Sequence, residues 1–290
     1  MKSITEEARE VGVEHEMTVI YSFVDDFLKA HPTLAHWRRS NNNQPIFTDA
    51  EVITIALLQG SLKVATLKDA YRRIAENYRT AFAHLCSYGQ WIARLHQLTS
   101  LIGHLVRAAL HSAELWDTLY LVDSKPIPMC KPVRHGRVRL LSDEGAAFGK
   151  NSVGWFYGFK LHLLVHYTGA ILTAILTPGN WNDRDPGLAL AWSLGGGTVL
   201  ADLGYPGEEF EQTLLEEADL LLITPKHAGE KGDHRRTLIS SLRERVETTF
   251  SSLYNRFIDR VLSRSWDGLW NTVKLKLIHY NLCQSGTLSV

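Results

Sequence analysis

YLVDSKPIP, residues 120–128, leads three apolar or aromatic residues directly into an aspartate, which serine, lysine and two prolines follow. Aliphatic and aromatic residues in such a run are typical of a buried β-strand, whereas serine and proline are typical of turns. We therefore predict a short strand over residues 119–122 that ends at Asp123. Two interpretations of this carboxylate stay open: it caps a turn, or it belongs to a site at the end of the strand.

A second predicted strand ends in the same way. In TVLADLGY, Val199 and Leu200 precede Asp202, and Gly204 follows it. Ligands of open α/β sheets bind beyond the carboxyl ends of strands, so the two aspartates can bridge a metal if the two strands are neighbours. Paired carboxylates of this kind hold Mg²⁺, and two such ions stabilise the attacking and leaving oxygens when a phosphodiester is cleaved.

A third carboxylate is expected on the predicted helix that contains SLRERVETTFSSL. Two glutamates are candidates for it. Glu247 follows Val246 at the edge of the apolar helical face, whereas Glu244 lies between two arginines. The spacing favours Glu247, although an ordinary solvated glutamate fits the same position.

The first 115 residues predict an all-helical module. TDAEVITIALLQGSL begins with a capping box formed by Thr48 and Glu51. A second stretch, residues 91–116, repeats apolar residues at helical spacing. The module is either a packing scaffold or a DNA-binding unit of the helix-turn-helix type.

Beyond about residue 115 the pattern changes to short apolar strands separated by turn signals. Thr168 and Gly169 between two such runs predict a hairpin. Pro186 then predicts the start of a helix with Asp185 as its N-cap. Two further strands alternate with helices, so we expect an α/β sheet with a meander at its start.

Composition limits the class of protein. The 290 residues are 45% hydrophobic, and 31 Lys or Arg balance 31 Asp or Glu. Between Ser124 and Ser142, however, five Lys or Arg occur with no acid, as expected of a neutral protein with a basic working face. The polar N-terminus predicts no signal peptide, no run of residues predicts a membrane span, and the three distant cysteines predict no disulfide framework.

Several basic residues near the two aspartates are candidates for contacts with phosphate, because Lys and Arg position a nucleic-acid backbone. A solvated basic loop is the competing interpretation. For His162 a structural role is favoured over metal binding, and Asp183 either supports the site or forms a turn. The phosphate candidates are Lys125, Arg134, Arg137, Arg139 and Lys160.

Four motifs occur in a fixed order: LVDSKP, GFKLHLLVHYTGAILTAILTPGNWND, LADLGYPG and RERVETTF. Together they resemble the DDE transposases of bacterial insertion sequences, with the insertion sequence nine-eight-two group or the neighbouring insertion sequence four group as the nearest match. The resemblance covers roughly residues 48–285. In the insertion sequence four branch an arginine precedes the catalytic glutamate by four residues, and Arg243 matches that position if the glutamate is Glu247.

The resemblance implies a ribonuclease H-like mixed sheet flanked by helices, preceded by an all-helical domain. The domains would be residues 1–115, possible binders of DNA, and residues 116–290, the catalytic domain. The Asp-Asp-Glu triad falls on Asp123, Asp202 and Glu247, which would hold two Mg²⁺ ions that Mn²⁺ can replace. Arg243 and Arg256 join the candidates for DNA contacts, although Tyr254 stands where the family has a lysine.

The implied function is transposition. Such an enzyme binds double-stranded DNA at the terminal inverted repeats of its own element, cleaves a strand and transfers it to target DNA, as a homodimer when it synapses two ends. We expect it in the cytoplasm of a bacterium or archaeon, at the nucleoid. Two alternatives remain, another ribonuclease H-like nuclease and a non-catalytic DNA-binding protein derived from a transposase.

Overall fold

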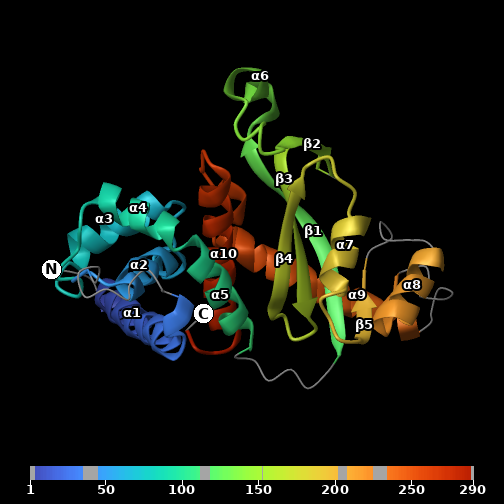
Figure 1. Ribbon diagram of the computed structural model, residues 1–290, viewed down its shortest axis with the longest axis horizontal. Coiled ribbons are helices and arrows are strands. Elements are labelled where there is room, and N and C mark those ends of the chain that lie inside the picture. Colours follow the sequence, from blue (N-terminus) through green and yellow to red (C-terminus); the bar gives the residue numbers. More distant parts are fainter. Residues whose placement is uncertain are drawn as a thin grey trace. The chain divides into compact units, whose positions relative to one another are not determined.

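The computed structural model describes residues 4–34, 45–111, 118–151, 153–201, 208–224 and 234–288. The chain forms two compact units, which Figure 1 draws in sequence colours. The first comprises Met1–Ser112, Asn255–Phe257 and Val261–Val290, and the second comprises Ala113–Tyr254 and Ile258–Arg260.

The first unit is helical, as predicted. Its α2 begins with the expected capping box: the Glu51 carboxylate accepts the backbone N–H of Thr48 at 2.6 Å, and Thr48 Oγ1 accepts the N–H of Glu51 at 3.2 Å. The stretch predicted as one helix over residues 91–116 contains two helices, because the first of them ends at Leu98. The helices are α1 (Ile4–Ala30), α2 (Asp49–Ser61), α3 (Leu67–Asn77), α4 (Tyr88–Gln97), α5 (Thr99–His111) and α10 (Trp266–Gln284).

The last helix, α10, completes the core of this unit. It packs against α2 and α5 and buries Leu275, Ile278 and Leu282 among the apolar side chains of those helices. The predicted domain of residues 116–290 differs from this division at its C-terminal end. Sequence order could not indicate the difference, because burial of an apolar face depends on contacts between distant segments. In the part of the chain that the structure describes, no helix combines the length and the hydropathy needed to span a membrane.

The second unit contains one mixed sheet, which confirms the predicted α/β class. Strand β1 lies at its centre, antiparallel to β3 on one edge and parallel to β5 on the other. The outer edge of β3 pairs with β4 and, near its start, with β2, whereas β6 extends the sheet beyond β5. The strands are β1 (Leu119–Cys130), β2 (Ala147–Lys150), β3 (Trp155–His166), β4 (Ile171–Pro178), β5 (Gly197–Leu200) and β6 (Leu220–Ile223).

The predicted hairpin joins β3 to β4. The backbone N–H of His166 donates to Ala170 O at 2.8 Å, and Gly169 between them takes a φ of +100°, which favours glycine. The helices of this unit are α6 (His135–Val138), α7 (Arg184–Ala191), α8 (Glu208–Ala218) and α9 (His234–Asn255), with short 3₁₀ turns at Pro132–Arg134 and Ile258–Arg260.

The predicted start of α7 is wrong by two residues. The helix begins at Arg184, so Asp185 lies in its first turn instead of at the N-cap. The side chain of Asn182 accepts the N–H of Asp185 at 3.1 Å and donates to the Asp185 carboxylate at 3.0 Å. The free N–H of Asp185 in the first turn of α7 is therefore satisfied by the side chain of Asn182.

A glycine in α2 tests the packing of the helical unit. A Cβ on Gly60 would lie 2.4 Å from the ring of His279, and that ring is held by Ser61 Oγ and by the Arg256 guanidinium, each at 3.1 Å. We expect Gly60→Ala to lower the free energy of unfolding by about 1–3 kcal/mol, since overpacking displaces anchored groups. Urea unfolding followed by circular dichroism measures the change.

The matched control is Gly12→Ala in α1, where an added Cβ meets nothing within 4 Å. This change should stabilise the protein by up to about 1 kcal/mol, because alanine is the better helix former. Equal stability of the two variants would contradict the packing described for Gly60.

Candidate active site

Strand β1 does not stop at Asp123, so the predicted strand end at this residue is wrong. The strand continues to Cys130, because β3 pairs with it from Tyr120 to Cys130 with one bulge at Met129. The two prolines of β1 are tolerated because their backbone nitrogens point away from β3. Ile127 O and Met129 N lie against Gly158 of β3. The alternating positions, Pro126 and Pro128, therefore have their nitrogens on the other edge, where no N–H is needed for the pairing with β3.

Asp123 nevertheless lies beyond the end of the neighbouring strand β5. The parallel pairs between β1 and β5 run from Leu119 opposite Thr198 to Leu121 opposite Leu200, where the pairing stops. The adjacency that the sequence analysis required of the two strands is confirmed. From Val122 onward, β1 therefore has one paired edge and one edge without β5.

The Asp123 carboxylate is held by its two successors in the chain. Its Oδ1 accepts the backbone N–H of Ser124 at 2.8 Å, and its Oδ2 lies 3.4 Å from Lys125 Nζ. The Lys125 ammonium also lies 5.8 Å from the centre of the Phe250 ring on α9. The side chain of Asp123 keeps 22% of its surface exposed, so solvent or a ligand can reach it.

Helix α9 brings a glutamate to the same place. A hollow of about 50 Å³ is lined by Asp123 and Lys125 of β1, by Ala201 after β5, and by Arg243 and Glu247 of α9. Glu244 is not among its lining residues. Of the two glutamates left open by the sequence, Glu247 is thus the one that shares a hollow with Asp123.

The third predicted carboxylate, Asp202, lies outside the described residues. The residue before it, Ala201, lines the hollow and donates its backbone N–H to Ile223 O of β6 at 3.0 Å. Within the described ranges no group of three or more His, Cys, Asp or Glu is placed to hold a metal. The predicted triad is therefore described at two of its three positions.

Tyr254 is a residue of this region to which the sequence assigned no role. It follows Glu247 by seven residues and so shares a helical face with it. Burial raises the pKa of its phenol, and the nearby carboxylates of Asp259 and Asp123 raise it further. The phenol is therefore a neutral hydrogen-bond donor at pH 7, at the position where the resemblance had only marked a departure from the family's lysine.

The opposite face of β1 carries a second polar cluster. Asp183, directly before α7, accepts Ser124 Oγ at 2.8 Å and Lys160 Nζ at 3.1 Å on the same carboxylate oxygen. Lys160 Nζ also donates to the backbone oxygen of Trp181 at 2.8 Å. Asp183 thus holds the side chain of Ser124, whose backbone N–H in turn holds Asp123. The ammonium of Lys160 binds oxygens of the protein itself, at Asp183 and Trp181.

His162 lies beneath this cluster, fully buried. Its Nε2 is 2.8 Å from Thr177 Oγ1, and its Nδ1 is 3.9 Å from the Asp183 carboxylate. Burial lowers its pKa to about 4, against the opposing effect of the Asp183 carboxylate, and Lys160 adds a smaller lowering effect. The imidazole is therefore neutral at pH 7, which agrees with the structural role that the sequence favoured.

The other predicted DNA contacts are not among the residues that line the hollow. Arg134, Arg137 and Arg139 are exposed on the 3₁₀ turn and α6, beyond the end of β1 (Figure 1). Arg256 belongs to the helical unit, where its guanidinium contacts His279 and lies 5.6 Å from the centre of the Tyr280 ring. A DNA contact by any of them stays a prediction.

Strand order, the central carboxylate and the glutamate on the packed helix together define a ribonuclease H-like protein. A family model described as a transposase DDE domain matches residues 114–259. Since the match spans half of the 290 residues, the chain belongs to this family, and the resemblance to DDE transposases is confirmed. Neither a curated protein nor a solved structure matches the chain.

The neutral buried His162 predicts a loss of stability in acid. Its pKa is about 4 in the folded state against about 6.5 in an unfolded chain, so the unfolded state takes up the proton first. The stabilisation is complete above about pH 6.5 and is lost as the pH falls toward 4. Between pH 6.5 and pH 4, the free energy of unfolding measured in urea should fall by up to about 3 kcal/mol less in His162→Gln than in the wild type.

His84→Gln is the control, because His84 is an exposed histidine of the helical unit. It should follow the wild-type curve at every pH. A His162→Gln curve parallel to that of the wild type would show that the buried imidazole does not titrate as proposed.

Proposed function

We propose that this protein is an active transposase that binds the ends of its own insertion sequence, cleaves a DNA strand there, and joins the freed 3′-hydroxyl to target DNA. The observation that carries the proposal is the hollow that Asp123 and Glu247 share with Ala201, the residue before Asp202. Membership of the transposase DDE family supports the reaction class. Terminal inverted repeats and target DNA are the proposed partners, with two copies of the chain synapsing two ends.

The residues of the hollow fit a divalent metal ion. The acidic side chains that line it are Asp123 and Glu247, which offer the oxygen ligands that Mg²⁺ prefers. The Lys125 ammonium at 3.4 Å from Asp123 indicates that a cation is favoured there. Asp123, Asp202 and Glu247 would hold the metal, and two bound Mg²⁺ ions would activate water and stabilise the charge on the scissile phosphate.

The chain's own residues position the acids and the DNA. Ser124 donates its N–H to Asp123 and its hydroxyl to Asp183, so the carboxylate has a defined orientation before any ligand arrives. Lys125 and Arg243 line the same hollow and can bind phosphate oxygens. The flexible stem of Lys125 allows its ammonium to leave Asp123 for a phosphate when a metal ion takes its place.

The exposed arginines after β1 extend the proposed DNA path. Cys130 lies seven residues beyond Asp123, which at the usual rise of a strand is about 23 Å, or roughly seven base pairs of duplex. Arg134, Arg137 and Arg139 follow it in a stretch that is exposed. They would hold the DNA backbone away from the cleavage point, without any role in sequence recognition.

Neutral replacements of the triad test this proposal. Asp123→Asn, Asp202→Asn and Glu247→Gln should each lower Mg²⁺-dependent cleavage of a labelled element end by at least about a hundredfold, because metal-ion stabilisation of the transition state is worth several kcal/mol. Binding of the same DNA in Ca²⁺ should persist. Denaturing gels measure cleavage and strand transfer, and fluorescence anisotropy measures binding.

Glu244→Gln is the matched control, one helical turn from Glu247 and outside the hollow. It should cleave like the wild type. Cleavage retained by Glu247→Gln, or lost in Glu244→Gln, would refute the site. A wild-type protein that cuts element ends without ever joining them to target DNA would instead be a nuclease.

A further inference from the structure

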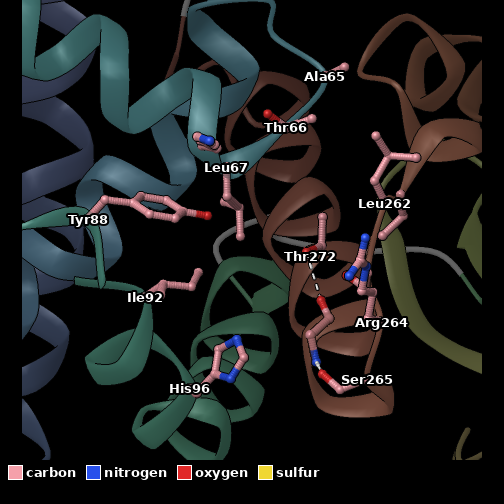
Figure 2. A pocket seen from close by; sticks show the side chains of 14 residues that line it. Ala65, Thr66, Leu67, Tyr88, Ile92, His96, Leu262, Arg264, Ser265 and Thr272 are labelled. Carbon is pink, nitrogen blue, oxygen red and sulfur yellow. Dashed lines mark hydrogen bonds between the residues drawn. The ribbon is translucent and has the colours of Figure 1, made fainter. Parts of the chain in front are cut away.

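A second and larger hollow lies within the helical unit. It measures about 440 Å³ and is lined by the start of α3, by one side of α4, by residues 261–265 before α10, and by Gly268 and Thr272 of α10 (Figure 2). We call it the helix groove. It is open to solvent at its rim, where Lys68, His96 and Arg264 are exposed.

The charge of the helix groove has one sign. Its three basic side chains come from three different elements, and none of them forms a hydrogen bond or an ion pair in the described part of the chain. Among the described residues that line the groove there is no Asp or Glu. The nearest acid on α3, Asp69, is used by its own helix: it accepts Thr66 Oγ1 at 2.7 Å and pairs with Arg72 at 3.0 Å.

Several other cations of the helical unit are neutralised by carboxylates. Arg94 binds Asp49 at 2.7 Å, and Lys29 binds Asp25 at 2.6 Å. The rim of the groove instead gathers basic side chains from three elements, and none of them is paired with an acid in the described part of the chain. A concave surface of this kind concentrates anions.

The interior of the groove is apolar and carries one fixed donor. Leu67, Ile92 and Leu262 contribute aliphatic surface, and Leu262 is 76% exposed. Figure 2 shows the Tyr88 hydroxyl pointing into the hollow. The Tyr88 ring packs against Trp91 with centroids 6.0 Å apart, and the hydroxyl has no hydrogen-bond partner within the described residues. Burial raises the pKa of this phenol, so it remains a donor at neutral pH.

From this combination we infer that the helix groove binds a segment of a DNA strand, with phosphates on Lys68, His96 and Arg264, and with sugar and base edges against the apolar wall. A nucleotide unit needs both kinds of contact, and a purely anionic ligand such as inorganic phosphate would use only the rim. The open rim admits a continuous strand. The inference rests on the proposed function and gives the helical unit a part in holding the element's DNA.

Fluorescence anisotropy on the full-length protein tests the inference. Binding of a labelled duplex of about 30 base pairs from the element's end is measured in Ca²⁺ over a range of salt concentrations. The double variant Lys68→Ala with Arg264→Ala should weaken binding at least about fivefold and lower the salt slope by roughly two, one for each lost phosphate contact. Tyr88→Phe should weaken binding and leave the salt slope unchanged, because it removes a hydrogen bond and no charge.

Arg72→Ala is the matched control. Arg72 is also an exposed cation of α3, but it is paired with Asp69 and does not line the groove. It should bind DNA like the wild type, and thermal unfolding should be the same for all variants. Wild-type affinity and salt slope in the double variant would overturn the inference, as would an equal loss in Arg72→Ala.

Competition identifies the source of the nucleotide. Deoxyadenosine monophosphate at millimolar concentration should displace the duplex only weakly. The DNA inference is wrong if this nucleotide binds the wild type tightly and the double variant weakly, while the duplex binds both equally well. The groove would then bind free nucleotides. The proposed function is tested separately by cleavage in Mg²⁺. If the wild type binds DNA without cleaving it, and the double variant loses that binding, the inference about the groove is supported and the proposed function is refuted.

Discussion

The pairing of β1 with β3 is the constraint on which the candidate site depends. Ten residues of β1 are paired along one edge, whereas β5 occupies the other edge only as far as Leu121. Asp123 therefore has a rigid backbone and an open side. Were the chain to turn at Ser124, as its local sequence suggests, the carboxylate would lie on a loop and lose the fixed orientation that a metal ligand needs.

Strand alternation gives neighbouring residues of β1 different functions. Asp123 faces the hollow bordered by α9, and Ser124 faces Asp183 before α7. The two faces are connected, because the N–H of Ser124 holds Asp123 while its hydroxyl is held by Asp183. Lys160 and buried His162 complete the second cluster, so a polar group on one side of the sheet stabilises the position of an acid on the other.

The sequence predicted those features that depend on local patterns. The helical first unit, the Thr48 capping box, the hairpin at Gly169 and the mixed sheet all follow from periodicity or turn chemistry. The strand end at Asp123 was wrong because two prolines outweighed a partner that lies about forty residues away in the chain. The place of α10 in the helical core was missed for the same reason, since its apolar face gives no indication of which distant helices cover it.

Lys125 shows most clearly what the sequence left open, because a contact with phosphate and a contact with water both remained as interpretations. The structure gives a third: its ammonium neutralises Asp123 and rests over Phe250. The described side chains of the hollow thus contain two acids, Asp123 and Glu247, and two bases, Lys125 and Arg243. A site balanced in this way cannot accept divalent cations without moving a positive charge outward. The displaced ammonium remains beside the hollow, where the phosphate of an incoming strand would restore the balance, so metal and DNA should favour each other's binding.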